Sequence, residues 1–377
     1  MNETIQNRSE IVFLYDIKDA NPNGDPLDEN KPRIDEETDI NIVTDVRLKR
    51  TVRDYLYDYK DRFEELENQD IFVREIEYEP GAIQDAKMRA RDFVECSDNG
   101  ENTEIINNFI NGEKIKKTDI EIIKKNIRDN LTKDCIDVRL FGATVPLEFT
   151  KDEIEGSSNN SIKSTMTFIG PVQFRFGRSL HKVDMKFVKG TGAFASRAGK
   201  QQKTFRQEYI LPYSLIGFYG VINENAAKKT GLTESDINLF MDGLWNGTKN
   251  LLTRSKMGQV PRLLLRIIYT ENNFHIGDLN GKIELVIKDK DMEEKEIRNV
   301  SDFYLDVSKL IKSLKNNVNM IESIELKADA DLEFVNKELQ LIQLKETLEN
   351  AGLNVNEFKD PFDNKTAENK EELVVSE

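Results

Sequence analysis

The chain has 377 residues, of which 38% are apolar, and its formal net charge is −15 at pH 7. This length fits one large domain or two joined ones, and this apolar share can fill a sizeable core. The longest apolar runs, such as residues 263–269, are far shorter than the roughly 18 residues that cross a bilayer. The start MNETIQNRSE is too polar for a signal peptide, so we expect a cytoplasmic protein with no membrane partner.

The cysteines and histidines do not form a metal or disulfide pattern. Cys96, Cys135, His181 and His275 are too few and too far apart for a disulfide framework or a zinc site. Residues 19–24 match the opening of a calcium loop, but the twelfth position is Asn30, where a bidentate Glu is required. We therefore expect no metal and no cofactor.

The first predicted elements are a strand and a helix. Residues 10–17 are apolar on both faces, as a central strand requires, and residues 19–40 are rich in turn formers. A helix begins at Thr44, and at about 100° per residue its apolar and basic side chains fall on opposite sides. The apolar side holds Leu48, Val52, Tyr55, Leu56, Tyr59 and Phe63, and the exposed basic side holds Arg47, Lys49, Arg50 and Arg53.

A helical insertion is predicted next. Residues 71–143 are charged and helical in pattern, whereas core pattern returns in residues 144–182, with strand alternation from 165 to 176. Strand pattern resumes over 205–223. A capping box at Thr233 and Asp236 then predicts a second core helix, and residues 262–269 are typical of a buried strand.

Without the insertion, the order is strand, helix, strand, strand, helix, strand. We therefore predict an α+β fold, with a ferredoxin-like or RNA-recognition-like βαββαβ palm built on an antiparallel sheet. Between 173 and 206 lie nine Lys or Arg residues and one acid, Asp184. This segment is predicted to project as a basic hairpin that binds a polyanion. The plainer alternative is a solvated hairpin without a ligand.

Five motifs, taken in order, resemble the backbone subunit of type I CRISPR interference complexes, with subtype I-B most similar. They are DANPNGDP (19–26), TDVRLKR (44–50), DVRLFG (137–142), GPVQF (170–174) with GRS (177–179), and RSKMG (254–258). The resemblance covers residues 11–269, about two thirds of the chain.

The resemblance implies a palm (1–70, 144–182 and 207–290), a helical fingers insertion (71–143) and a thumb hairpin (183–206). Beyond the resemblance, a C-terminal α/β extension (291–358) is predicted. Residues 283–287 and 321–326 are typical of strands and residues 334–351 of a helix, and these segments are expected to pack beside the fingers or against neighbouring subunits. Residues 359–377 are too charged to pack and are expected to be disordered.

The resemblance also implies a function in antiviral defence. Copies of such a subunit polymerise head to tail along CRISPR RNA into a helical filament, together with other Cascade subunits. The guide is thereby presented for pairing with target DNA, and the subunit itself is not an enzyme.

The candidate RNA ligands are cations, amides and exposed rings. Guanidinium groups can bind phosphates bidentately, and Gly24 permits close backbone approach to a sugar or phosphate. The plainer alternatives are a solvated helix face, ordinary turn residues and, for the last two cations, a helix C-terminal cap. The full set is Asn21, Asn23, Gly24, Arg47, Lys49, Arg50, Arg53, Gln173, Arg175, Arg178, Lys186, Phe187, Phe194, Arg197, Lys200, Arg254 and Lys256.

A rival hypothesis uses the same loop for catalysis. Asp25 or Asp28 could hold a metal ion that activates water, as an aspartate in a comparable region does in backbone subunits of the related type III complexes. The chain would then be a metal-dependent ribonuclease subunit of an RNA-targeting effector.

Overall fold

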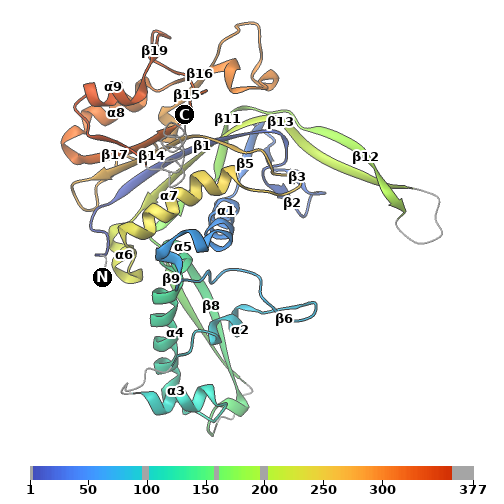
Figure 1. The fold of residues 1–377 in the computed structure, drawn as a ribbon, viewed down its shortest axis with the longest axis vertical. Helices are drawn as coiled ribbons and strands as arrows, with labels where there is room; N and C mark the ends of the chain where they lie inside the picture. The colour runs from blue at the N-terminus through green and yellow to red at the C-terminus, as the bar shows by residue number, and fades with distance from the viewer. Residues whose placement is uncertain (1–2, 96–101, 157–160, 196–202, 359–377) are drawn as a thin grey trace, which may run out of the picture. The chain divides into compact units, whose positions relative to one another are not determined.

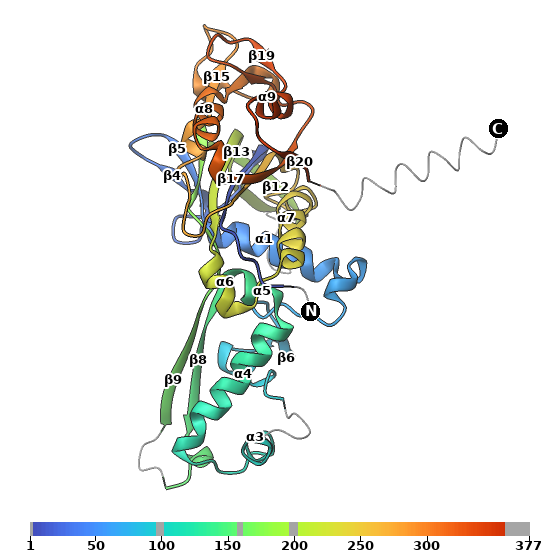
Figure 2. The same ribbon diagram turned by 90° about the vertical axis from the view of Figure 1, so that its left-hand side faces the viewer.

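The structure is a computed structural model that describes residues 3–95, 102–156, 161–195 and 203–358, and the side chains of 191–206 also lie outside this description. The chain divides into two compact units (Figures 1 and 2). Unit 1 is Met1–Gln6, Leu56–Gln173 and Asn223–Phe240, and unit 2 is Asn7–Tyr55, Phe174–Ile222 and Met241–Glu377. No helix in the described part of the chain is long and apolar enough to span a membrane.

A ten-stranded sheet forms the centre of unit 2. Its order is β20-β17-β14-β1-β13-β11-β5-β4, and β10 and β12 also pair with β13. β1 pairs antiparallel with both β13 and β14, so the predicted first strand is indeed central. The bounds are β1 Ser9–Ala20, β4 Ile34–Asp35, β5 Ile40–Val43, β10 Val172–Phe174, β11 Gly177–Lys182, β12 Lys186–Ala195, β13 Lys203–Ile222, β14 Val260–Tyr269, β17 Ile321–Ala328 and β20 Val355–Glu357.

Two helices lie on one face of this sheet: α1 (Asp45–Asp58) and α7 (Glu234–Lys249) (Figure 2). They approach closely because α7 has small residues at the contact. A Cβ on Gly243 would lie 3.0 Å from Val52 Cγ1, and one on Gly247 would lie 2.9 Å from Tyr55 Cβ. The Tyr55 hydroxyl donates to Asp242 at 2.8 Å, which ties the two helices together.

The C-terminal residues cover the other face of the sheet. Val12 and Leu14 share an apolar cluster with Leu310 and Leu314 of α8 (Ser308–Asn316) and Leu348 of α9 (Leu344–Asn350). Coverage from both sides explains why every residue from 9 to 17 is buried. Part of this extension belongs to the main sheet itself, since β17 and β20 continue it beyond β14.

A small four-stranded sheet, in the order β15-β16-β18-β19, joins the residues just before the extension to the extension itself. The strands are β15 Glu284–Ile287, β16 Phe303–Asp306, β18 Phe334–Val335 and β19 Leu341–Ile342. The strands predicted at 283–287 and 321–326 are confirmed. The helix predicted over 334–351 was wrong in its first half, where Phe334–Val335 and Leu341–Ile342 form two short strands, and helix is found over Leu344–Asn350.

Unit 1 contains the predicted helical insertion, built on one apolar cluster. Ile123, Ile127 and Leu131 of α4 pack against Leu147 of β8 and Phe168 of β9. Among the described strands, β8 and β9 pair with each other alone, so residues 144–169 belong with the insertion and not, as predicted, with the palm. The elements of the insertion are β6 Glu77–Glu79, β7 Ala82–Ile83, α2 Ala86–Arg91, α3 Thr103–Ile110, α4 Ile120–Asp134, α5 Ile136–Phe141, β8 Gly142–Thr150 and β9 Ser161–Ile169. Unit 1 also contains α6, Glu224–Thr230.

The DVRLFG motif holds unit 1 together. Buried Asp137 accepts hydrogen bonds from the backbone N–H groups of Phe72 (2.8 Å) and Val73 (3.1 Å). Arg139 donates to both carboxylate oxygens of Asp236, from Nε at 3.0 Å and from Nη2 at 2.7 Å. Gly142 has φ +73°, and a Cβ there would lie 2.2 Å from the Phe168 carbonyl oxygen, so a glycine is required. This motif therefore has a structural role.

The basic segment forms a hairpin, as predicted. β12 pairs antiparallel with the first half of β13, from Lys186 opposite Ile210 to Ala195 opposite Lys203. No other strand in the described residues pairs with β12. Figure 1 shows this two-stranded ribbon extending away from the main sheet of unit 2.

Candidate nucleic-acid interface

Three motifs that lie far apart in the sequence meet beside the end of β1. The backbone N–H of Asn21 donates to the Ser255 carbonyl at 2.8 Å, which joins the loop after β1 to the loop after α7. Asn23 Oδ1 accepts from the N–H (2.8 Å) and the hydroxyl (2.9 Å) of Thr44, the residue before α1. The fold therefore brings DANPNGDP, TDVRLKR and RSKMG together in unit 2.

The centre of this region is a pair of half-buried cations, Arg47 and Lys256. Arg47 donates to the Thr51 hydroxyl at 3.1 Å, and Lys256 donates to the Ser255 hydroxyl at 3.0 Å. Within the described residues neither forms an ion pair with a carboxylate, and Arg47 Nε is buried without a hydrogen-bond partner. Both cations therefore retain hydrogen-bonding capacity that an anion can use.

The pKa values of both cations reflect this environment. Burial lowers the pKa of Lys256, and the Arg47 charge lowers it further. Burial also lowers the pKa of Arg47, while the nearby Asp54 and Tyr15 oppose this effect. An anion placed between the two side chains would raise both pKa values, because it favours the charged form of each cation.

The other basic residues of α1 are engaged within the protein. Lys49 pairs with Asp45 at 3.0 Å and Arg50 with Asp54 at 2.5 Å, each one helical turn apart. Arg53 is only 8% exposed, so its predicted place on an exposed basic face was wrong. The helical projection missed this because it assumes a single apolar side, whereas α1 is covered more widely.

The amides of the loop after β1 also act within the protein. Asn21 is 3% exposed and its Nδ2 donates to the Asn30 carbonyl at 2.7 Å, contrary to the expectation of an amide presented at the surface. Asn23 caps α1 through Thr44, as described above. Gly24 is required by Asn30, since a Cβ at residue 24 would lie 2.1 Å from Asn30 Oδ1. These residues shape the loop.

The candidates on the strands before the thumb are exposed and paired. Gln173, in unit 1, donates to the Gly170 carbonyl at 2.9 Å. Arg175 pairs with Asp278 at 2.8 Å and lies over the Tyr219 ring, and Arg178 pairs with Asp35 at 3.1 Å.

The thumb presents apolar and basic side chains together at its base. Phe187 and Val188 are each 44% exposed, and Lys189 lies over the Phe187 ring. Lys186 pairs with Asp184. The side chain of Phe194 lies outside the described part of the structure, as do Arg197 and Lys200 altogether.

The two aspartates of the rival hypothesis each have a cation as partner. Asp25 pairs with Arg33 at 2.7 Å, and Asp28 with Lys31 at 2.6 Å. Among the described residues no group of three or more His, Cys, Asp or Glu side chains could hold a metal ion. The two ion pairs instead stabilise a small hairpin, in which β2 (Gly24–Asp25) pairs antiparallel with β3 (Lys31–Pro32).

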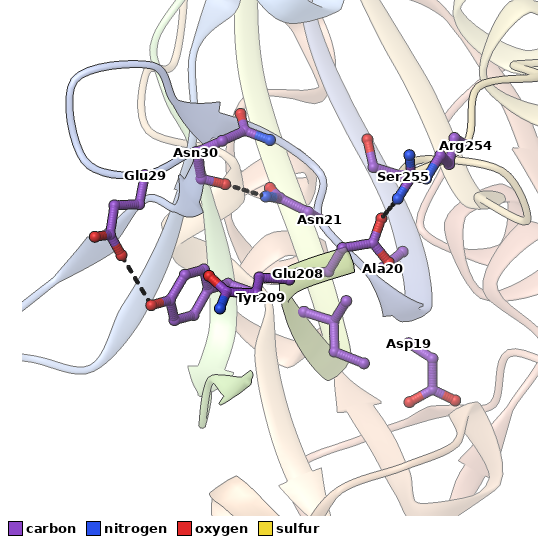
Figure 3. A pocket seen from close by; sticks show the side chains of 11 residues that line it. Asp19, Ala20, Asn21, Glu29, Asn30, Glu208, Tyr209, Arg254 and Ser255 are labelled. Carbon is purple, nitrogen blue, oxygen red and sulfur yellow. Dashed lines mark hydrogen bonds and ion pairs between the residues drawn. The ribbon is translucent and has the colours of Figure 1, made fainter. Parts of the chain in front are cut away.

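A pocket of about 410 Å³ lies between this hairpin and the base of the thumb (Figure 3). Arg254 reaches into it and pairs with Glu208 of β13 at 2.9 Å. Tyr209, on the same strand, donates its hydroxyl to Glu29 at 2.9 Å. Sequence reasoning missed Glu208, Tyr209 and Glu29, because nothing in a strand's alternation indicates which loops lie against it.

Comparison with known proteins identifies the family. The family model described as "CRISPR-associated protein Cas7" matches residues 7–308, well over half of the chain. The chain belongs to the Cas7 family. A curated CRISPR-associated protein Cas7 of Haloferax volcanii is 31% identical over 336 residues, which cover 88% of this chain and 89% of that relative. All five motifs lie within the part that matches the Cas7 family model.

Two solved structures share a distant similarity. Their titles are "CRISPR RNA-guided surveillance complex, pre-nicking" and "CRISPR RNA-guided surveillance complex". The TM-scores are 0.41 and 0.40, with 11% identity in both cases. The matches cover 88% and 86% of this chain and 96% and 92% of the two solved chains. At TM-scores below 0.5, neither similarity carries weight in the argument for the fold of this Cas7 protein.

Proposed function

We propose that this Cas7-family chain is the guide-RNA-binding backbone subunit of a type I Cascade complex, of subtype I-B. Copies assemble head to tail along CRISPR RNA in the cytoplasm, with other Cascade subunits, and present the guide for pairing with target DNA. The observation that carries the proposal is the pair Arg47 and Lys256, two half-buried cations whose side chains donate to hydroxyl groups and, among the described residues, form no ion pair with a carboxylate.

A backbone subunit needs contacts that do not depend on sequence, because each copy meets a different stretch of guide. Phosphate is the same at every nucleotide, and cations that bind it supply affinity without base readout. Arg47 and Lys256 suit this role. Exposed Phe187 and Val188 on the thumb can contact base faces, which also tolerates any sequence.

We also propose a ferredoxin-like palm. The strand order β14-β1-β13-β11 supports this, as does the place of α1 after β1 and of α7 between β13 and β14. In this scheme the fingers run over residues 71–169, the thumb over 183–206 and the C-terminal extension over 291–358. The remaining tail, 359–377, lies outside the described residues.

Nucleic acid that co-purifies with the chain from its native host tests the proposal. We expect RNA of repeat-spacer sequence in stoichiometric amount, in particles whose mass grows with RNA length by native mass spectrometry. Protein that is free of nucleic acid, or that carries random cellular RNA of mixed sequence, would contradict it.

The rival ribonuclease hypothesis predicts metal-dependent cleavage. We expect none from the purified chain with Mg²⁺ or Mn²⁺, alone or assembled on guide RNA, because Asp25 and Asp28 each neutralise a cation of the same hairpin. The measurement is gel analysis of labelled RNA and DNA. Asp45→Asn is the matched control, since it also removes a carboxylate paired with a lysine. Cleavage that Asp25→Asn or Asp28→Asn abolishes, and that Asp45→Asn leaves intact, would establish the rival.

A further inference from the structure

The thumb hairpin is gripped at its base from both sides of one strand. Successive side chains of a strand point to opposite faces, and Glu208 and Tyr209 are successive residues of β13. Arg254 pairs with Glu208 on one side (2.9 Å). On the other side Glu29 accepts from the Tyr209 hydroxyl (2.9 Å), and Lys31 Nζ lies 5.5 Å from the centre of the Tyr209 ring. Figure 3 shows Glu208 and Tyr209 reaching in these two directions.

The two gripping loops are joined to each other through Asn21. Its backbone N–H bonds to Ser255, the neighbour of Arg254, and its side chain bonds to the carbonyl of Asn30, the neighbour of Glu29. Asn21 is almost completely buried, so water does not compete for these hydrogen bonds. The contacts therefore close a ring that runs from β13 through both loops and back to β13, around the pocket described above.

The ring meets the hairpin at its first rungs. Tyr209 lies opposite Phe187 and Glu208 opposite Val188, next to the first pair of the ladder, Lys186 with Ile210. β12 pairs only with β13 among the described strands, and a two-stranded ribbon has little rigidity of its own. Contacts at the base therefore decide the direction in which the whole ribbon points.

We propose that this ring is a clamp that fixes the direction of the thumb. Arg254, Asn21 and Glu29 are then positioning residues that act on the thumb through Glu208 and Tyr209, and Arg254 is not a phosphate ligand. The effect of the clamp on assembly rests on the proposed function: a thumb held at one angle can meet the neighbouring copy or the RNA at a constant spacing. The clamp itself is a property of the free chain and can be measured without RNA.

Spin labels provide the direct test. With Cys96 replaced by Ser, labels at Thr191→Cys in β12 and Lys312→Cys in α8 report the distance from thumb to sheet by double electron–electron resonance. We expect one narrow distance distribution, broadened by Glu208→Arg and again narrow in the charge-swapped Glu208→Arg/Arg254→Glu chain. A distribution that stays narrow in Glu208→Arg/Tyr209→Ala would overturn the clamp.

RNA binding separates positioning from phosphate contact. For Arg254→Gln we expect unchanged affinity for a short single strand and an unchanged salt slope, with assembly on a long guide weakened about two- to fivefold per subunit junction. Loss of a phosphate ligand would instead lower the slope by about 0.7, and that result would overturn the positioning role. If the parent chain binds no RNA, the proposed function fails, while the spin-label experiment still decides the clamp.

Discussion

Replacing Arg47 and Lys256 together by Gln is expected to weaken binding of single-stranded RNA by about two to four orders of magnitude. Each charge-assisted hydrogen bond contributes about 1.5–3 kcal/mol, and the loss should be equal for unrelated sequences because phosphates carry no sequence information. The slope of log K against log salt should fall by about 0.7 for each lost contact. Titrations of two unrelated RNAs at several salt concentrations measure both quantities.

A matched control removes two positive charges elsewhere in unit 2. Lys312 and Lys315 are exposed on α8, which packs on the opposite face of the sheet from α1. Lys312→Gln/Lys315→Gln changes the net charge equally and should leave affinity and slope nearly unaltered. An equal loss in both double variants would mean that only total charge matters, and an unchanged slope in the Arg47/Lys256 variant would remove these residues from the site.

Replacing Arg262 by Met is expected to destabilise the main sheet of unit 2 by about 3–5 kcal/mol, because it leaves Asp16 buried without its charged partner. Arg262 Nε lies 2.9 Å from Asp16 Oδ2, and both side chains are less than a tenth exposed. The Tyr213 hydroxyl also donates to Asp16, at 2.8 Å. Burial raises the pKa of Asp16, and the Arg262 charge opposes that shift. Urea denaturation of both chains gives the difference in free energy of unfolding.

Two further variants show whether the loss comes from the unpaired carboxylate. Asp16→Leu/Arg262→Met removes both charges and should recover most of the lost stability, since an apolar pair of similar volume replaces a buried ion pair at little net cost. Arg178→Met also breaks an Arg–Asp pair, but one whose arginine is 54% exposed, and should cost less than about 1 kcal/mol. A small loss in Arg262→Met, comparable with that of Arg178→Met, would refute a buried, stabilising pair.

Most of the core elements could be predicted from the sequence because their signals are local. The apolar run that became β1, the amphipathic start of α1 and the capping box of α7 each depend on neighbours within a few residues. In the structure Thr233 and Asp236 do form the reciprocal hydrogen bonds of that box. The predicted helix over 334–351 was wrong for the converse reason, since β18 exists by pairing with β16, about thirty residues earlier.

The sequence by itself determined the α+β class, the order of the core elements, the basic hairpin and the cations that are candidates for RNA binding. These follow from composition and short-range periodicity. Only the tertiary structure decided which of these candidates are buried and which are paired within the protein. It placed Arg47 beside Lys256, buried Arg53, paired Arg254 with Glu208 and turned Asn21 inward. The physical reason is that the state of a charged or polar side chain depends on burial and partners, and in a sheet built from distant segments the partners lie far away in the sequence.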